Sequence, residues 1–332
     1  MSISASTGRG KPVRQPEPDQ LRLLGKVARM YHERGIRQPQ IAAELSLSQA
    51  RVSRLLRQAT ELGIVRTVVT MPAGTFTDIE DQIQDRYDLR DVIVVDAGGS
   101  GGDVMPALGA ATADYLDVTL TGGHVIGVSS WSETLIAAVD AMTPKPSPVV
   151  DQVVQILGGL GDPAVQMQAT RLTDRLANLT GGTPVFLSAP GMVGTPAARK
   201  AMMNDPSISA VTALWKKLTV ALVGIGSLEP SPLLRRSGNA ISEAEQDELR
   251  ARGAVGDVCF RYFDADGQQV RSKLDERLIG ITADELLAIP RRIGVAGGQR
   301  KFSAIRAALR GQWINVLITD LTMARRLAED AT

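Results

Sequence analysis

The stretch PQIAAELSLSQARVSRLLRQATELGIV, residues 39–65, decides the fold of the amino-terminal part of this chain. Its first segment, 39–45, has a small apolar face that predicts a short helix, and a proline is tolerated in the first turn of a helix. A Ser-Leu-Ser turn follows. The next segment, 49–62, carries apolar residues at helical spacing, and Ser48 is a suitable N-cap for it. Two short helices joined by a tight turn are typical of a helix-turn-helix.

The flanking residues extend this motif on both sides. Upstream, apolar residues recur at helical spacing from Asp19, and Gly35 ends the helix that they predict. Downstream of Gly63, the run IVRTVVTM alternates like a β-strand. Three helices and a strand predict a winged helix-turn-helix over 18–71. The preceding residues, 1–17, are rich in Gly, Pro, Ser and Arg and predict a disordered basic arm.

The third helix of this unit is narrow enough to enter the major groove of DNA, where its amino-terminal residues meet base edges. Its outward side chains include hydroxyl and amide groups that donate and accept hydrogen bonds, and arginines that suit phosphates. The alternative is a three-helix bundle with a solvated basic face. DNA binding is favoured, and the residues predicted to carry it are Gln38, Ser48, Gln49, Arg51, Ser53, Arg54 and Arg57.

The net charge of the chain is only +1, but the charge is divided unevenly. Residues 1–66 carry a net charge of +7, whereas residues 67–332 carry −6. Such an asymmetry indicates a small basic module that meets a polyanion, joined to a larger acidic module. The distribution therefore supports operator DNA as a partner of the first module.

The composition excludes several classes of protein. The chain has 332 residues, 44% of them hydrophobic, which suits two domains with sizeable cores. The single cysteine, Cys259, excludes an internal disulfide framework and is predicted to be a buried apolar residue. Two histidines, His32 and His124, are too few for a His-based metal centre or a Ser-His-Asp hydrolase. No segment resembles a membrane helix or a secretory signal, so we expect a cytoplasmic protein with no membrane partner, metal or cofactor.

The remainder of the chain, 72–332, alternates strand and helix patterns. Continuous β-branched runs separated by helical segments imply a mostly parallel sheet covered on both faces, which is an α/β, Rossmann-like domain. The predicted strands are 91–96, 124–129, 153–157, 184–188, 219–226, 258–263, 292–297 and 314–320. The predicted helices are 78–89, 103–118, 132–142, 163–179, 196–218 (broken near Pro206), 242–252, 282–288, 300–310 and 321–329.

Ligands of such sheets bind beyond the carboxyl ends of the strands. The segment GVSSWSET, 127–134, lies where a strand ends and a helix begins, and its hydroxyl and amide groups suit an anion or a polyol. Glycines also follow other strands, although most such glycines only mark turns. Trp131 is either ordinary core or the aromatic lining of a sugar site. Asp320 directly precedes a helix and is predicted to be its N-cap rather than a ligand.

An enzymatic function has weak support in the sequence. The glycine-rich run DAGGSGGD, 96–103, follows a strand, but its glycine spacing does not match the dinucleotide-binding fingerprint. The chain contains no P-loop lysine motif and no nucleophile elbow. A mechanism that uses only carboxylates stays open, because Glu133 and Asp257 are both candidates for the pocket. The pattern favours binding over turnover.

The helix-turn-helix and the long α/β domain together resemble the SorC family of sugar-responsive bacterial transcription regulators over about residues 20–330. The likeness also rests on GVSSWSETL, QILGG, FLSAPGMV, TVALVGIG, GAVGDVCFRYFD, ERLIGI, VAGGQRKFSAIRAAL and INVLITD, which occur in the family's order. The resemblance implies a large domain of the sugar-phosphate-isomerase type, used as a sensor with catalysis lost. It also implies homotetramers that occupy operator DNA and rearrange when an effector binds.

The resemblance further implies the residues that bind the effector: Ser129, Ser130, Trp131, Ser132, Glu133, Thr134, Gln155, Asp257 and Lys301. One departure matters, because the family often ends the first loop with Gly-Arg-Thr and this chain has Ser132-Glu133-Thr134. A carboxylate in place of a cation disfavours a phosphate group. We therefore expect an unphosphorylated sugar or polyol. The alternative is a sugar phosphate held by backbone amides, hydroxyls and Lys301.

The function that follows is regulation of a carbohydrate or polyol catabolic operon, with an operator affinity that the effector switches. Two alternatives stay open. One is a sugar-phosphate isomerase-like enzyme with an accessory DNA-binding head. The other is an architectural DNA-binding protein whose large domain serves only for oligomerisation.

Overall fold

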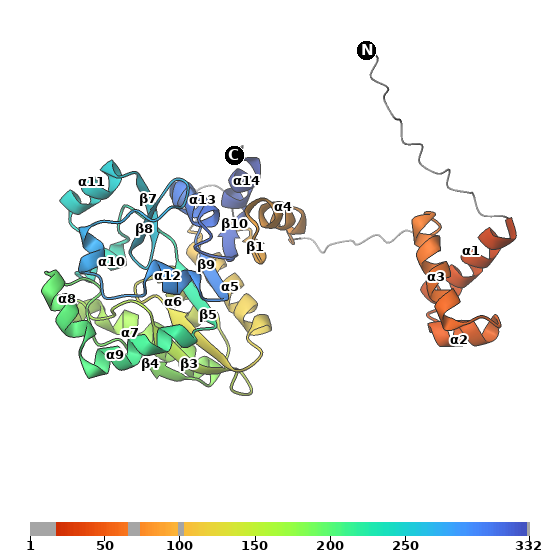
Figure 1. Cartoon of the computed structure of the whole chain (residues 1–332), viewed down its shortest axis with the longest axis horizontal. Helices are drawn as coiled ribbons and strands as arrows, with labels where there is room; N and C mark the ends of the chain where they lie inside the picture. Colours follow the sequence, from red (N-terminus) through yellow and green to blue (C-terminus); the bar gives the residue numbers. More distant parts are fainter. Residues whose placement is uncertain (1–17, 66–73, 99–102, 331–332) are drawn as a thin grey trace, which may run out of the picture. The chain divides into compact units, whose positions relative to one another are not determined.

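The computed structural model describes residues 18–65, 74–98 and 103–330. The chain divides into two compact units, residues 1–71 and 72–332, and each is described below by itself (Figure 1). Three sequence predictions fall wholly or largely outside the described residues. They are the disordered arm over 1–17, most of the wing strand after Gly63, and the centre of the glycine-rich run 96–103.

The first unit is built from the three predicted helices. They are α1 (Pro18–His32), α2 (Gln38–Glu44) and α3 (Gln49–Glu61). Ser48 caps α3 as predicted, because its side chain accepts a hydrogen bond from the Arg51 amide at 3.3 Å. The apolar faces of the three helices form one core, which includes Leu24, Val27, Ile41, Val52, Leu55 and Leu56. Burying these faces leaves the polar face of α3 exposed.

The second unit is organised around a seven-stranded sheet in the order β1-β10-β9-β5-β2-β3-β4. Every neighbouring pair in this sheet is parallel, which confirms the predicted fold class. The strands are β1 (Asp91–Val95), β2 (His124–Val128), β3 (Val150–Gln155), β4 (Thr183–Val185), β5 (Val220–Gly224), β9 (Arg291–Val295) and β10 (Val316–Asp320).

Helices cover both faces of this sheet, because its central strands are apolar on both sides. Along β5, Val220 and Leu222 pack into one core, whereas Ala221 and Val223 pack into the other. The first core is completed by α5 (Met105–Thr119), α6 (Glu133–Ala141) and α7 (Pro163–Thr180). The second is completed by α4 (Thr77–Tyr87), α13 (Phe302–Arg310) and α14 (Leu321–Glu329). The parallel strands thus send all their carboxyl ends to one edge.

A small antiparallel sheet lies in the segment between β5 and β9. It consists of β6 (Gly226–Ser227), β7 (Ala254–Val258) and β8 (Arg261–Asp264). The predicted strand 258–263 is therefore wrong in its extent. A hairpin turn at Cys259-Phe260 interrupts it, and both residues have positive φ angles of 53° and 61°. The shorter helices of this region are α10 (Pro232–Arg236), α11 (Glu243–Ala251), η2 (Lys273–Glu276) and α12 (Ala283–Leu287). The 3-10 turn η3 (Gln299–Lys301) follows β9.

The predicted helix 196–218 is broken, as the proline at 206 indicates. It divides into α8 (Pro196–Met203) and α9 (Pro206–Ala213), followed by the 3-10 turn η1 (Leu214–Lys217). Asp205 is the residue before the proline, and its side chain caps α9 by accepting from the Ser207 amide at 2.8 Å. A proline is compatible with the first turn of a helix but not with its interior, so the break falls there.

Candidate functional site

A cavity of about 1430 Å³ opens at the carboxyl ends of the central strands of the second unit. Segments that follow β2, β5, β9 and β10 line it, together with the β7–β8 hairpin. This is the edge of a parallel sheet at which ligands bind in α/β proteins. The cavity is larger than the range of roughly 300–1,000 Å³ that is usual for small-ligand pockets. It therefore has room for a sugar or polyol together with water.

The loop after β2 contributes a wall of this cavity. Ser129, Trp131, Ser132, Glu133 and Thr134 all line it, as the sequence predicts. Ser132 also caps α6, because its hydroxyl accepts from the Leu135 amide at 3.3 Å. The helix therefore begins at the cavity and directs its amino-terminal dipole toward it, which favours anionic or hydroxyl oxygens there.

Ser130, which the sequence places in the effector site, does not line the cavity. Its side chain is fully buried, and its hydroxyl donates to the Leu157 carbonyl at 2.8 Å. Trp131 is both a core residue and part of the cavity lining. It is almost fully buried, its indole N–H donates to the Gly158 carbonyl at 3.1 Å, and it still forms part of the cavity lining.

Gln155 is likewise outside the cavity. Its side chain is buried at the end of β3, and its Oε1 accepts a hydrogen bond from the Leu187 amide at 2.8 Å. The residue ties the end of β3 to the segment after β4. In the described structure its side-chain oxygen therefore binds the backbone and does not line the cavity.

Asp257 and Lys301 both line the cavity and influence each other electrostatically, although they are distant in the sequence. The Lys301 ammonium donates to the Ile225 carbonyl at 2.9 Å, and Asp257 pairs with Gly226 across the small sheet. Gly226 must be a glycine here, because a Cβ on it would lie 2.0 Å from Asp257 Oδ1. The backbone after β5 therefore positions both charged groups.

Burial controls the ionisation of this pair. Burial raises the pKa of the Asp257 carboxyl to about 6, while the Phe260 amide and Lys301 act in the opposite direction. Burial also lowers the pKa of Lys301, against the attraction of Asp257 and Glu133. Desolvation disfavours each charged form, and the partner charge favours it. Around neutral pH the cavity base therefore holds a carboxylate that readily accepts hydroxyl hydrogen bonds.

Glu133 carries the second carboxylate of the cavity, and a cation accompanies it. The guanidinium of Arg236 on α10 lies 3.9 Å from Glu133 Oε1. The neighbouring Arg235 lines the cavity and donates to the Pro230 carbonyl at 3.0 Å. Sequence reasoning missed α10, because no strand or recognisable motif precedes it. The only signal available was Ser231-Pro232, a typical helix start.

The remaining candidate residues have structural roles. Asp320 is the N-cap of α14, as predicted, since it accepts from the Met323 amide at 3.0 Å. It also accepts from the Gly298 amide at 2.7 Å, which shapes the loop that carries Lys301. Cys259 is buried as predicted, and burial raises the pKa of its thiol. His124 lies at the opposite end of β2 from the cavity.

The first unit presents a different surface. Gln49, Arg51, Ser53, Arg54 and Arg57 are all exposed on α3. The hydroxyl of Ser48 is used in capping, and Gln38 is partly buried at the start of α2. Side chains that face solvent on one helix can enter a groove together, so α3 is able to present hydrogen-bonding and cationic groups to DNA.

Within the residues that the structure describes, no group of three or more His, Cys, Asp or Glu side chains is arranged to hold a metal ion. The helices of the same residues include none that is long and apolar enough to cross a membrane.

Both units of the chain are similar to known proteins. Residues 72–329 match the family model of a sugar-binding domain. The deoxyribonucleoside regulator of Bacillus subtilis (strain 168) is 32% identical over 310 residues, which are 92% of this chain and 96% of the relative. The sorbitol operon regulator of Klebsiella pneumoniae is 30% identical over 320 residues, 93% of this chain and 98% of the relative. The crystal structure of the full-length sorbitol operon regulator SorC from Klebsiella pneumoniae superposes with a TM-score of 0.70 at 29% identity, covering 94% of this chain and all of that one.

Proposed function

Because this chain belongs to the SorC family of sugar-binding transcriptional regulators, we propose that it controls a carbohydrate or polyol catabolic operon through one small effector. The effector binds in the cavity at the carboxyl ends of the strands, and its binding changes the affinity of the first unit for operator DNA. The observation that carries this proposal is the convergence of Asp257, Lys301 and the loop after β2 on one cavity.

The cavity suits a ligand rich in hydroxyl groups. Of the carboxylates that line it, we propose that Asp257 and Glu133 accept hydrogen bonds from the effector, and that Lys301 donates them. Ser129, Ser132 and Thr134 do both. Glu133 faces Arg236 at 3.9 Å, so its charge is partly compensated and does not attract a further cation. A phosphate beside Glu133 would meet like charge, which supports an unphosphorylated sugar or polyol.

Operator binding falls to α3. We propose that Gln49, Arg51 and Ser53 contact base edges and that Arg54 and Arg57 contact phosphates; all five are exposed. Gln38 and Ser48 lie beside them at the starts of α2 and α3. One recognition helix reads a short half-site, so two heads are needed for a partly symmetric operator. We therefore propose a cytoplasmic homo-oligomer, a tetramer, held together by the second unit.

The effector switches the protein by preferring one arrangement of subunits over another. A coupling of roughly 1–3 kcal/mol between effector and operator corresponds to a change of about 5- to 150-fold in operator affinity. Loss of catalysis is part of this proposal, and the relatives are named as regulators. The second candidate, an isomerase-like enzyme, is favoured only by the two carboxylates in one cavity. It requires turnover of a sugar phosphate by the purified protein.

A thermal-shift panel tests the effector proposal. The purified chain is heated with D-sorbitol, D-mannitol, 2-deoxyribose and ribose, and with the phosphates of each. A ligand that binds only the native state raises the melting temperature in a saturable way. We expect one unphosphorylated compound to do so. If only phosphorylated compounds shift the transition, the neutral effector is wrong; if none does, the sensing role is wrong.

A further inference from the structure

The hairpin turn between β7 and β8 has an unusual sequence for its geometry. Cys259 and Phe260 both have positive φ angles, 53° and 61°, and they form a two-residue connection because Val258 pairs with Arg261. Such turns favour Asn-Gly or Gly-Gly, since other residues are strained in this conformation. Neither residue here relieves that strain. The surrounding structure must therefore hold the turn in place.

One restraint comes from the cavity side. The Phe260 amide donates to Asp257 Oδ2 at 2.9 Å, so the carboxylate spans the turn. Cys259 and Phe260 themselves line the cavity beside Asp257. The position of the carboxylate and the conformation of the turn are thus linked. If the turn relaxes, Asp257 loses the hydrogen bond that orients it.

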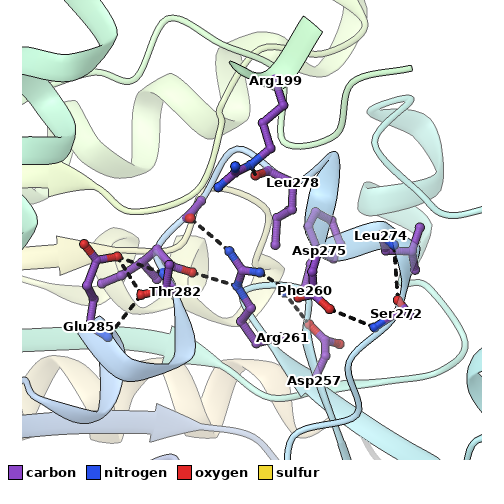
Figure 2. A network of polar contacts seen from close by, with 12 residues as sticks. Arg199, Asp257, Phe260, Arg261, Ser272, Leu274, Asp275, Leu278, Thr282 and Glu285 are labelled. Atoms are coloured by element: carbon purple, nitrogen blue, oxygen red, sulfur yellow. Dashed lines mark hydrogen bonds and ion pairs between the residues drawn. The ribbon is translucent and has the colours of Figure 1, made fainter. Parts of the chain in front are cut away.

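A second restraint comes from the other side of the hairpin, through Arg261 (Figure 2). Its side chain is only 5% exposed, and every nitrogen of the guanidinium has an acceptor. Nε donates to the Ile281 carbonyl at 2.8 Å, NH1 donates to Asp275 at 2.7 Å, and NH2 donates to the Gly280 carbonyl at 3.1 Å. Asp275 is itself fixed, because it accepts from the Ser272 amide at 2.9 Å.

We propose that Arg261 is a positioning residue for effector binding. By tying the Cys259-Phe260 turn to residues 275–281, it holds the Asp257 carboxylate in the geometry that accepts the effector's hydroxyls. Arg261 does not line the cavity and acts only through the turn. The inference rests on the proposed function, since it assumes that the cavity is the effector site.

The chain provides a matched control. Arg199 on α8 donates through Nε to the Leu278 carbonyl at 2.7 Å, in the same segment that Arg261 holds (Figure 2). Among the described residues, Arg199 makes no hydrogen bond or ion pair with the strained turn, and its positive charge only lowers the pKa of Arg261 by repulsion. Loss of either arginine weakens the anchoring of residues 275–281. Only loss of Arg261 should disturb Asp257.

The first arm of the test reads Asp257 without any effector. Melting temperature is measured from pH 4 to pH 9 for Arg261→Gln, Arg199→Gln and the unmodified protein, each with and without Asp257→Asn. The difference within each pair reports the ionisation of Asp257. The Phe260 amide lowers the pKa of this carboxyl, so its loss raises that pKa. We expect the transition to move to higher pH in Arg261→Gln and to stay in place in Arg199→Gln.

The groups that face Asp257 do not change between these variants. Lys301 stabilises its charge, and Cys259 and Tyr262 are affected by it in turn. A shift absent from Arg199→Gln is due to the turn when Arg261→Lys, which keeps the positive charge but not the three hydrogen bonds of the guanidinium, shows it as well. An unchanged transition in Arg261→Gln would overturn the proposal.

The second arm measures affinity by calorimetry at pH 7.5 with D-sorbitol and 2-deoxyribose and their phosphates. One of these compounds should bind the unmodified protein. We expect the affinity of Arg261→Gln for that compound to be about tenfold lower, which corresponds to the loss of one hydrogen bond to a charged group. Arg199→Gln should bind normally. Arg261→Lys and Asp275→Asn, which keep part of the network, serve if Arg261→Gln does not fold, and each should weaken binding to an intermediate degree.

The two arms separate the two ways in which the account can fail. Equal affinity in Arg261→Gln and Arg199→Gln refutes the positioning role and leaves the effector site intact. Absence of binding by the unmodified protein refutes the proposed function.

Discussion

At the scale of the residue, the cavity is defined by a few charged side chains whose desolvation lowers the stability of the fold. Asp257 is the clearest example, since it is partly buried beside the cavity, is influenced by the charge of Lys301, and has a pKa raised to about 6. A binding site often retains such a group at a cost in stability, because the ligand needs it. Glu133 is the second charge of interest, and we propose that it discriminates between a neutral and a phosphorylated effector.

Asp257→Asn should stabilise the protein while abolishing its effector response. A raised carboxyl pKa in the folded state means that stability is greatest below the unfolded value of 3.8 and is lost as pH rises through about 6. At pH 8 the amide removes this penalty, on the order of 3 kcal/mol. Denaturant unfolding at pH 8 and pH 4.5 measures it. A variant that is less stable at pH 8 would contradict the burial of the charge.

Glu133→Arg should weaken binding of a neutral effector. The guanidinium would remove a hydroxyl acceptor and would lie near Arg236, which now faces the carboxylate at 3.9 Å. We expect affinity for the unphosphorylated compound to fall about tenfold, the worth of one charge-assisted hydrogen bond. Calorimetry with the free sugar and its phosphate compares the two ligands directly. Unchanged or tighter binding of the free sugar would show that Glu133 does not accept from it.

At this scale, the sequence predicts which residues lie near the cavity better than it predicts what each side chain binds. The loop after β2, Asp257 and Lys301 all reach the cavity. Ser130 and Gln155 do not, because each satisfies a backbone group instead. A short polar side chain near a strand end can face either a ligand or the neighbouring backbone. No pattern along the chain distinguishes these two outcomes.

At the scale of the element, strand ends and turns decide where the site residues lie. Most helices and strands follow from hydrophobic periodicity, which is why the prediction of a parallel sheet with helices on both faces is confirmed. The β7–β8 hairpin was not predicted, because Cys259-Phe260 lacks the glycine or asparagine that normally marks such a turn. The run VCFRYF reads as one strand and folds as a turn and parts of two.

Gly226→Ala should impair effector binding without affecting the DNA-binding unit. A Cβ at this position would lie 2.0 Å from Asp257 Oδ1, so the carboxylate must move. We expect effector affinity to fall by at least about tenfold, with operator affinity in the absence of effector unchanged. Gly194→Ala is the control, because a Cβ there meets nothing within 4 Å. Normal effector binding by Gly226→Ala would mean that Asp257 does not contact the effector.

Arg54→Ala should weaken operator binding in a way that depends on salt. Arg54 is exposed on α3, and a phosphate contact contributes through release of counterions. We expect the slope of log affinity against log salt to fall by about one per contact. Arg29→Ala on α1 is the control, since Arg29 pairs with Glu33 at 2.9 Å. An unchanged slope for Arg54→Ala would remove α3 from the interface with phosphates.

At the scale of the whole molecule, we propose that the two units divide the work of binding DNA and binding a metabolite. The division of charge along the chain already indicates this, because a basic module of +7 precedes an acidic one of −6. Full-length alignment with the sorbitol operon regulator shows that the two units occur together in a relative. The arrangement of subunits is set by surfaces that no motif marks, so assembly could not be predicted from periodicity.

Lys301→Ala should separate the two functions. Lys301 lies in the cavity, where it donates to the Ile225 carbonyl at 2.9 Å, and it belongs to the second unit only. We expect the variant to bind operator DNA with the affinity of the unmodified protein and to ignore the effector. Circular dichroism and melting temperature establish that it is folded. Loss of DNA binding by a folded Lys301→Ala would refute the division of roles.

The most direct test of the central claim is an operator titration with and without effector. Fluorescence anisotropy follows labelled DNA from the protein's own promoter region, while each compound of the thermal-shift panel is added at saturation. We expect one unphosphorylated sugar or polyol to change the operator dissociation constant by at least about fivefold, and Lys301→Ala to abolish this change. A compound that binds the cavity but leaves operator affinity unaltered would contradict this expectation.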